Sequence, residues 1–146
     1  MTTRRGAAKP LAMAATSPLA ASGLVALGGG VGAVTRYQTG RLLTLVLGPA
    51  TVAAFPWATL VVNVAGSLAM GLLAGWLARF GGGGETWRLL IGVGLLGGFT
   101  TFSAFSLELM LLIERGQAGT AFAYAAISVL AGLTALYLGL IAMRLA

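Results

Sequence analysis

The sequence predicts an all-α membrane protein with four transmembrane helices, the third of which is broken near its centre. Two observations predict the membrane class: the chain of 146 residues is 58% hydrophobic, and only 8% of its residues are charged. Soluble domains carry about 25% charged residues, so this chain has too few polar groups to cover a globular surface. The third observation, four apolar stretches of about 20 residues or more, predicts that the chain crosses a bilayer repeatedly.

The four predicted spans are helices, because an open strand edge in lipid leaves backbone groups without hydrogen-bond partners. The second span has the clearest ends, since Trp57 and Trp76 are separated by roughly 28 Å of helix, close to the thickness of the hydrocarbon core. Pro56 suits the first turn of that helix. Short connections join the spans, whose predicted ranges are Leu19 to Leu43, Pro56 to Ala78, Trp87 to Ile113 and Ala118 to Met143.

The N-terminal residues are expected to lie outside this bundle. Residues 1–17 are interpreted as a disordered tail and residues 18–146 as the transmembrane domain. The apolar stretch after Lys9 ends within a few residues, at Thr16 and Ser17. A secretory signal needs about 7–15 apolar residues, so a targeting role for the tail is only the alternative.

The composition excludes most enzyme classes. The chain has no Cys, His or Asp, and its carboxylates are Glu85, Glu108 and Glu114. Metal hydrolases, catalytic triads and carboxylate pairs therefore lack their parts, and no enzyme is expected. The net charge is +6, but the basic residues stand singly near the ends of apolar runs. This pattern favours lipid head groups in a bilayer as the partner and argues against nucleic acid.

Glycine spacing predicts that the helices pack closely. Three GxxxG pairs occur, one in each of the first three spans, and small side chains let helix backbones approach each other in lipid. These pairs are Gly28/Gly32, Gly71/Gly75 and Gly94/Gly98.

Polar side chains within the spans are costly, so each one is a candidate functional residue. Asn63 lies about 9 Å into the second span, and Thr59 lies one turn before it on the same face. Tyr124 and Ser128 share a face of the fourth span. Two structural alternatives stay open: Asn63 could form an interhelical hydrogen bond, and Ser128 could bond a carbonyl of its own helix.

The stretch GGFTTFSAF, residues 97–105, predicts the break in the third span. As one continuous helix this span would be about 40 Å long, more than the hydrocarbon core requires. Gly97 and Gly98 lower the helix propensity at its centre, and the hydroxyls of Thr100 and Thr101 compete for backbone hydrogen bonds. The freed carbonyls must face protein, water or an ion, and discontinuous helices in transporters use such carbonyls to bind Na⁺.

Two phenyl rings follow the break on one helical face, Phe102 and Phe105. Ring faces are negative and ring edges positive, so a pair that presents its edges to a narrow passage would attract a small anion without a formal charge. The alternative is that both rings pack against lipid or a neighbouring helix.

Three motifs in chain order resemble the CrcB/Fluc family of fluoride channels: GGGVGAVTRY (28–37), VNVAGSLAMG (62–71) and GGFTTFSAF (97–105). The resemblance covers the chain from about Gly23 to its C-terminus. It implies an antiparallel, dual-topology dimer of four-helix subunits in the bacterial inner membrane. It also implies a central structural Na⁺ held by the backbone carbonyls of Gly97 and Thr100.

The resemblance further implies which residues line the fluoride pathway. It assigns the lining to four residues: Asn63, Phe102, Phe105 and Ser128. Tyr124 and Thr59 would assist, Glu108 would lie close to the pore, and Arg36 would line an entrance. Gly132 departs from the family, which often has a further hydroxyl one turn after Ser128.

The expected function is passive export of cytoplasmic fluoride, which confers fluoride resistance. The alternative is a small dual-topology multidrug exporter coupled to protons, for which Glu108 is the intramembrane carboxylate that the third span offers. A non-transporting assembly subunit is a second alternative. Each side of the membrane has three basic residues once the tail is left out, so either a homodimer or a heterodimer with an oppositely oriented paralogue fits.

Overall fold

The computed structural model describes residues 16–81 and 84–146, and every regular element in these residues is helical. The expected tail lies almost entirely outside the described residues, as does the middle of the tetraglycine. Four helical segments are long and apolar enough to cross a membrane, which confirms the predicted class of a multi-pass α-helical membrane protein. The elements are α1 (Pro18–Leu47), α2 (Pro49–Ala54), α3 (Trp57–Phe80), α4 (Gly84–Trp87), η1 (Arg88–Leu96), α5 (Gly97–Phe99), α6 (Ser103–Glu114) and α7 (Ala118–Leu145).

The first span is longer than predicted and ends at Leu47 rather than Leu43. Ser17 caps its start by accepting a hydrogen bond from the backbone N–H of Ala20. The helix continues because its apolar sequence holds no breaker before Gly48, whose φ of 83° ends it. The first connection, for which only a short length is expected, contains the short helix α2.

Pro56 lies just outside the second span and not in its first turn, which corrects the predicted start by one residue. Its ψ of 60° is not helical, although its carbonyl already accepts a hydrogen bond from the backbone N–H of Leu60. This is the behaviour of a residue that flanks a helix start. Gly81, with a φ of 47°, ends α3.

The third span is broken as predicted, but the glycines are not where it breaks. Gly97 and Gly98 remain helical in α5, after the π-helical turns of η1, and the backbone becomes extended at Thr100 (φ −80°, ψ 163°). Helix resumes at Ser103. The glycines serve packing instead, since Gly98 lies against the backbone of Gly29 in α1.

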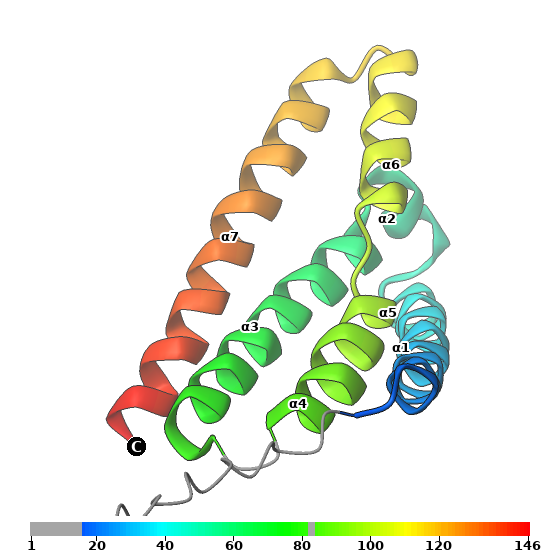
Figure 1. Ribbon diagram of the computed structural model, residues 1–146. Helices are drawn as coiled ribbons and strands as arrows, with labels where there is room; N and C mark the ends of the chain where they lie inside the picture. Colours follow the sequence, from blue (N-terminus) through cyan, green and yellow to red (C-terminus); the bar gives the residue numbers. More distant parts are fainter. Residues whose placement is uncertain (1–15, 82–83) are drawn as a thin grey trace, which may run out of the picture.

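Two close helix pairs form the bundle, α3 with α7 and α1 with the first half of the third span. Figure 1 looks nearly along α1, whereas α3 and α7 run side by side in the same direction across the picture. Glycines make both contacts: Gly71 lies against the Leu136 carbonyl, and Gly28 lies against the Leu90 carbonyl. The predicted role of the GxxxG pairs is confirmed. Because backbone meets backbone, the helices have little freedom to slide.

We expect Gly28→Ala to destabilise the protein, since a methyl group there would collide with the backbone of the third span. Overpacking of this kind costs about 1–3 kcal/mol. The matched control is Gly30→Ala in the same helix, where an added methyl group would have no neighbour within 4 Å. Thermal unfolding of the purified protein in detergent measures both variants, and equal midpoints would contradict the packing assignment.

Candidate functional site

Asn63 is hydrogen-bonded to the backbone of the broken third span. Its side-chain oxygen accepts the N–H of Thr101 at 2.8 Å, and its side-chain nitrogen donates to the Thr101 carbonyl at 3.0 Å. The interhelical hydrogen bond left open as an alternative is therefore present. An amide nitrogen carries two N–H groups, and this contact uses one of them. The second N–H is available to another acceptor.

The break removes the regular partners of two carbonyls. The N–H of Thr101, which would donate to the Gly97 carbonyl in a continuous helix, donates to Asn63 instead. The N–H of Ala104, which would serve the Thr100 carbonyl, donates to the side-chain oxygen of Thr101 at 3.2 Å. Gly97 and Thr100 are the two residues for which carbonyl ligation of Na⁺ is expected, and both carbonyls are released in this way. Gly97 is exposed on the surface of the chain.

Glu108 accepts two hydroxyl hydrogen bonds, one from each neighbouring span. Thr59 in α3 donates to one carboxylate oxygen at 2.7 Å, and Tyr124 in α7 donates to the other at 2.8 Å. Thr59 is 5% exposed and Tyr124 is fully buried. The structure thus brings these three predicted residues together around a half-buried Glu108. Both hydroxyl protons are committed to the carboxylate.

The two phenyl rings after the break continue into a small aromatic cluster. The centroids of Phe102 and Phe105 are 5.8 Å apart with planes tilted by 42°, and Phe105 lies 5.1 Å from Tyr124. Phe55 closes the cluster with an edge-on contact to Tyr124. Phe102 is 78% exposed, whereas Phe105 is half-buried. Phe102 is not isolated in apolar surroundings, because it lines a cavity of about 300 Å³ together with Asn63 and Thr101.

Ser128 is half-buried as a residue, but its hydroxyl oxygen is buried and has no hydrogen-bond partner within residues 16–81 and 84–146. The alternative of a bond to its own helix is therefore wrong, although Thr35, Thr44 and other helical hydroxyls do form such bonds. Leaving a buried hydroxyl unpaired costs about 1–3 kcal/mol, so an acceptor that reached this hydroxyl would be bound favourably.

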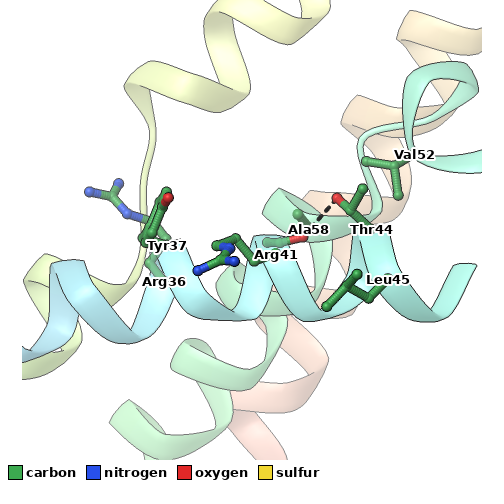
Figure 2. A pocket seen from close by; sticks show the side chains of 8 residues that line it. Arg36, Tyr37, Arg41, Thr44, Leu45, Val52 and Ala58 are labelled. Carbon is green, nitrogen blue, oxygen red and sulfur yellow. Dashed lines mark hydrogen bonds between the residues drawn. The ribbon is translucent and has the colours of Figure 1, made fainter. Parts of the chain in front are cut away.

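Arg36 lies apart from the other predicted residues, along a groove between α1 and the start of α3. The groove has a volume of about 520 Å³ and also contains Arg41, Tyr37 and Thr44. Figure 2 shows Arg36 and Tyr37 at one end of this groove, Val52 and Thr44 at the other, and Arg41 between them. Among the described residues the structure gives Arg36 no ion pair, so it does not compensate the charge of Glu108.

Sequence reasoning expected the Thr101 hydroxyl to compete for backbone hydrogen bonds, but it missed that Asn63 binds the Thr101 backbone, and it missed Arg115. Thr101 is the residue whose backbone Asn63 binds, and its side-chain oxygen also accepts the backbone N–H of Ala104 in the first turn of α6. A threonine just before a helix is a common side-chain cap, so its position could have indicated the second role. Arg115 donates to the Ala53 carbonyl at 3.4 Å and lines a cavity of about 190 Å³ that reaches Glu108. No local pattern signals that contact, because it depends on the placement of α2.

The arrangement offers uncharged donors rather than catalytic groups. A free amide N–H of Asn63, the Ser128 hydroxyl and the positive ring edges can stabilise an anion without an ionic bond. Within the described residues, no cluster of three or more His, Cys, Asp or Glu could hold a metal ion.

Comparison with known proteins gives one consistent result. Residues 23–140 match the family described as "CrcB-like protein, Camphor Resistance (CrcB)". A protein of Novosphingobium aromaticivorans named "Fluoride-specific ion channel FluC" is 61% identical over 126 residues, which are 86% of this chain and 98% of that protein. Proteins with the same name from Erythrobacter litoralis and Caulobacter vibrioides are 53% and 51% identical, over 91% and 83% of this chain and 98% and 93% of their own lengths.

We expect Asn63→Ala to destabilise the fold, because it leaves the N–H and C=O of Thr101 without partners inside the bundle. Each unpaired buried group costs about 1–3 kcal/mol. Ser106→Ala is the matched control: the Ser106 hydroxyl bonds the Phe102 carbonyl, which also accepts the Ser106 N–H. Thermal unfolding in detergent compares the two variants, and an Asn63→Ala midpoint equal to that of Ser106→Ala would refute the structural role of the amide.

Proposed function

Because the chain belongs to the CrcB family, we propose that it is a fluoride-selective ion channel that lets cytoplasmic fluoride leave the cell. The proposal rests on the relatives named above and on the uncharged donors of the site. The observation that carries it within this chain is the buried, unpaired hydroxyl of Ser128 in the same bundle as the ring pair and the free N–H of Asn63.

The donors explain how a channel could take up so strongly hydrated an ion. Fluoride must lose water to enter a narrow passage, and each lost water has to be replaced by a donor. Conduction also requires binding weak enough for the ion to leave. Asn63, Ser128 and the edges of Phe102 and Phe105 supply such donors without a fixed charge. Thr59 and Tyr124 assist indirectly, since Glu108 holds both hydroxyls in place.

The direction of flow follows from acid–base chemistry and the membrane potential. Hydrogen fluoride crosses membranes as a neutral molecule and ionises at cytoplasmic pH, so fluoride accumulates inside. An interior-negative potential drives the anion outward with about 2.3 kcal/mol per 100 mV. No energy-coupling group is required. Arg36 and Arg41, in the groove beside α1, would raise the local concentration of anions at an entrance.

The working unit is proposed to be an antiparallel dimer of this chain. Phe102 and Gly97 are exposed near the middle of the third span, where a second copy would cover them. The carbonyls of Gly97 and Thr100 fit a Na⁺ ion, because the break has released both from helical hydrogen bonds. Two carbonyls are too few for a cation in lipid, and a second copy would double the set. A heterodimer with an oppositely oriented paralogue would meet the same need.

One observation favours a second candidate, a proton-coupled exporter: Glu108 is a half-buried carboxylate within a span. Proton coupling requires this carboxylate to release its partners in each cycle. Its two short hydroxyl bonds, to Thr59 and Tyr124, argue for a positioning role instead.

We expect the protein reconstituted in liposomes to release fluoride rapidly, and chloride much more slowly, without a proton gradient. Phe102→Ile should lower fluoride efflux by about fivefold or more, since it removes a ring edge worth on the order of 1 kcal/mol or more to the passing anion. A fluoride electrode measures the efflux, with a chloride electrode as control. Proton-dependent dye export without halide flux would instead identify the exporter.

The matched control for the ring is Val129→Ile, which adds one methylene at an exposed apolar position of α7. It should conduct as the unaltered protein does. Equal fluoride flux in Phe102→Ile and in the unaltered protein would remove the ring from the pathway while leaving the function standing.

We expect Na⁺ to raise the thermal unfolding midpoint of the detergent-solubilised protein, because a ligand that binds only the folded state stabilises it by mass action. N-methyl-D-glucamine chloride at the same ionic strength is the control and should give no rise. A midpoint independent of Na⁺ would exclude the ion site. Light scattering on the same sample checks the dimer, and the mass of a single chain would contradict it.

A further inference from the structure

The contact between α3 and α7 places their polar residues at matching levels. Thr59 of α3 and Tyr124 of α7 meet at Glu108. Lower in the pair, Gly71 lies against Leu136, and Gly75 lies beside Leu140. The same sequence separation relates the two members of each of these pairs, so the two helices run alongside one another in one constant register. Figure 1 shows both helices running in the same direction.

This register defines further levels between Glu108 and the glycine contact. One turn below Thr59 is Asn63, and one turn below Tyr124 is Ser128, so these two donors share a level. The next turn pairs Ser67 of α3 with Gly132 of α7. On α7 the row of polar side chains stops at Gly132, which has no side chain to donate a hydrogen bond.

The Ser67 hydroxyl occupies the space beside Gly132. A methyl group built on Gly132 would lie 3.5 Å from the side-chain oxygen of Ser67, and no other atom would lie closer than 4 Å. Ser67 also lines the 300 Å³ cavity that Asn63, Thr101 and Phe102 border. Unlike Thr44 or Ser106, Ser67 forms no bond to its own helix among the described residues. Its hydroxyl is therefore free to donate into that cavity.

We propose that Ser67 is a further fluoride-coordinating residue, which supplies from α3 the hydroxyl that Gly132 cannot supply from α7. The assignment rests on the proposed channel function and extends it by one level beyond Asn63 and Ser128. An ion leaving that level then meets another neutral donor rather than a gap in the row. Such a donor is worth about 0.5–1.5 kcal/mol, so its loss corresponds to roughly a threefold to tenfold change in rate.

The experiment moves the hydroxyl from one helix to the other. Fluoride efflux from liposomes is measured for the unaltered protein, for Ser67→Ala, and for Ser67→Ala combined with either Gly132→Ser or Gly132→Ala. We expect Ser67→Ala to lower the efflux about threefold to tenfold, Gly132→Ser to restore it, and Gly132→Ala to leave it low. The Cβ atom that both substitutions at Gly132 add makes only an ordinary contact, with the Ser67 oxygen.

Each result decides a separate question. Absent fluoride efflux from the unaltered protein defeats the proposed function itself. Normal efflux from Ser67→Ala overturns the role of Ser67 and leaves the function intact. If Gly132→Ala restores the efflux as well as Gly132→Ser does, the effect is one of packing. If Gly132→Ser does not restore the efflux, the hydroxyl acts elsewhere. Either result overturns the proposal. Should Ser67→Ala not fold, Ser67→Cys keeps the side-chain size with a weaker donor, and its efflux must also fall.

Discussion

The pair of hydrogen bonds between Asn63 and the backbone of Thr101 is the interaction on which the rest of the structure depends. A helix broken inside a bilayer exposes backbone groups that lipid cannot satisfy. One amide side chain provides both an acceptor and a donor, so it replaces the helical partners of the backbone N–H and C=O of one residue, Thr101. The break therefore has one defined backbone conformation and is not a loose segment.

This pair of hydrogen bonds has three consequences at the centre of the molecule. The third span is held to α3, the carbonyl of Gly97 is released, and Phe102 lies beside a cavity that Asn63 and Ser67 also line. The amide still keeps one N–H unused. A residue that looks purely structural in its contacts thus retains the means to contact an anion, and the two interpretations of Asn63 do not exclude each other.

Backbone contact at glycines sets the positions of the polar groups along the axes of α3 and α7. Because Gly71 and Gly139 bring the backbones of α3 and α7 into direct contact, the two helices have little freedom to shift along each other. The polar side chains of the two helices consequently lie at matching levels. Aromatic contacts from Phe55 and Phe105 to Tyr124 then close the cluster around Glu108 and keep its two hydroxyl bonds away from lipid.

The sequence by itself determined the membrane class, the number of spans, the break within residues 97–105 and the set of candidate residues. These features depend on composition, local propensity and spacing, which a single chain displays directly. The tertiary structure alone decided that the helix breaks at Thr100 rather than at Gly97 and Gly98, since the partner that draws off the Thr101 N–H lies on another helix. It likewise decided that Glu108 receives hydrogen bonds from hydroxyls of two spans and that the Ser67 oxygen lies beside Gly132. Hydrogen bonds and packing join residues that are distant in the chain, and their register is set only when the helices meet.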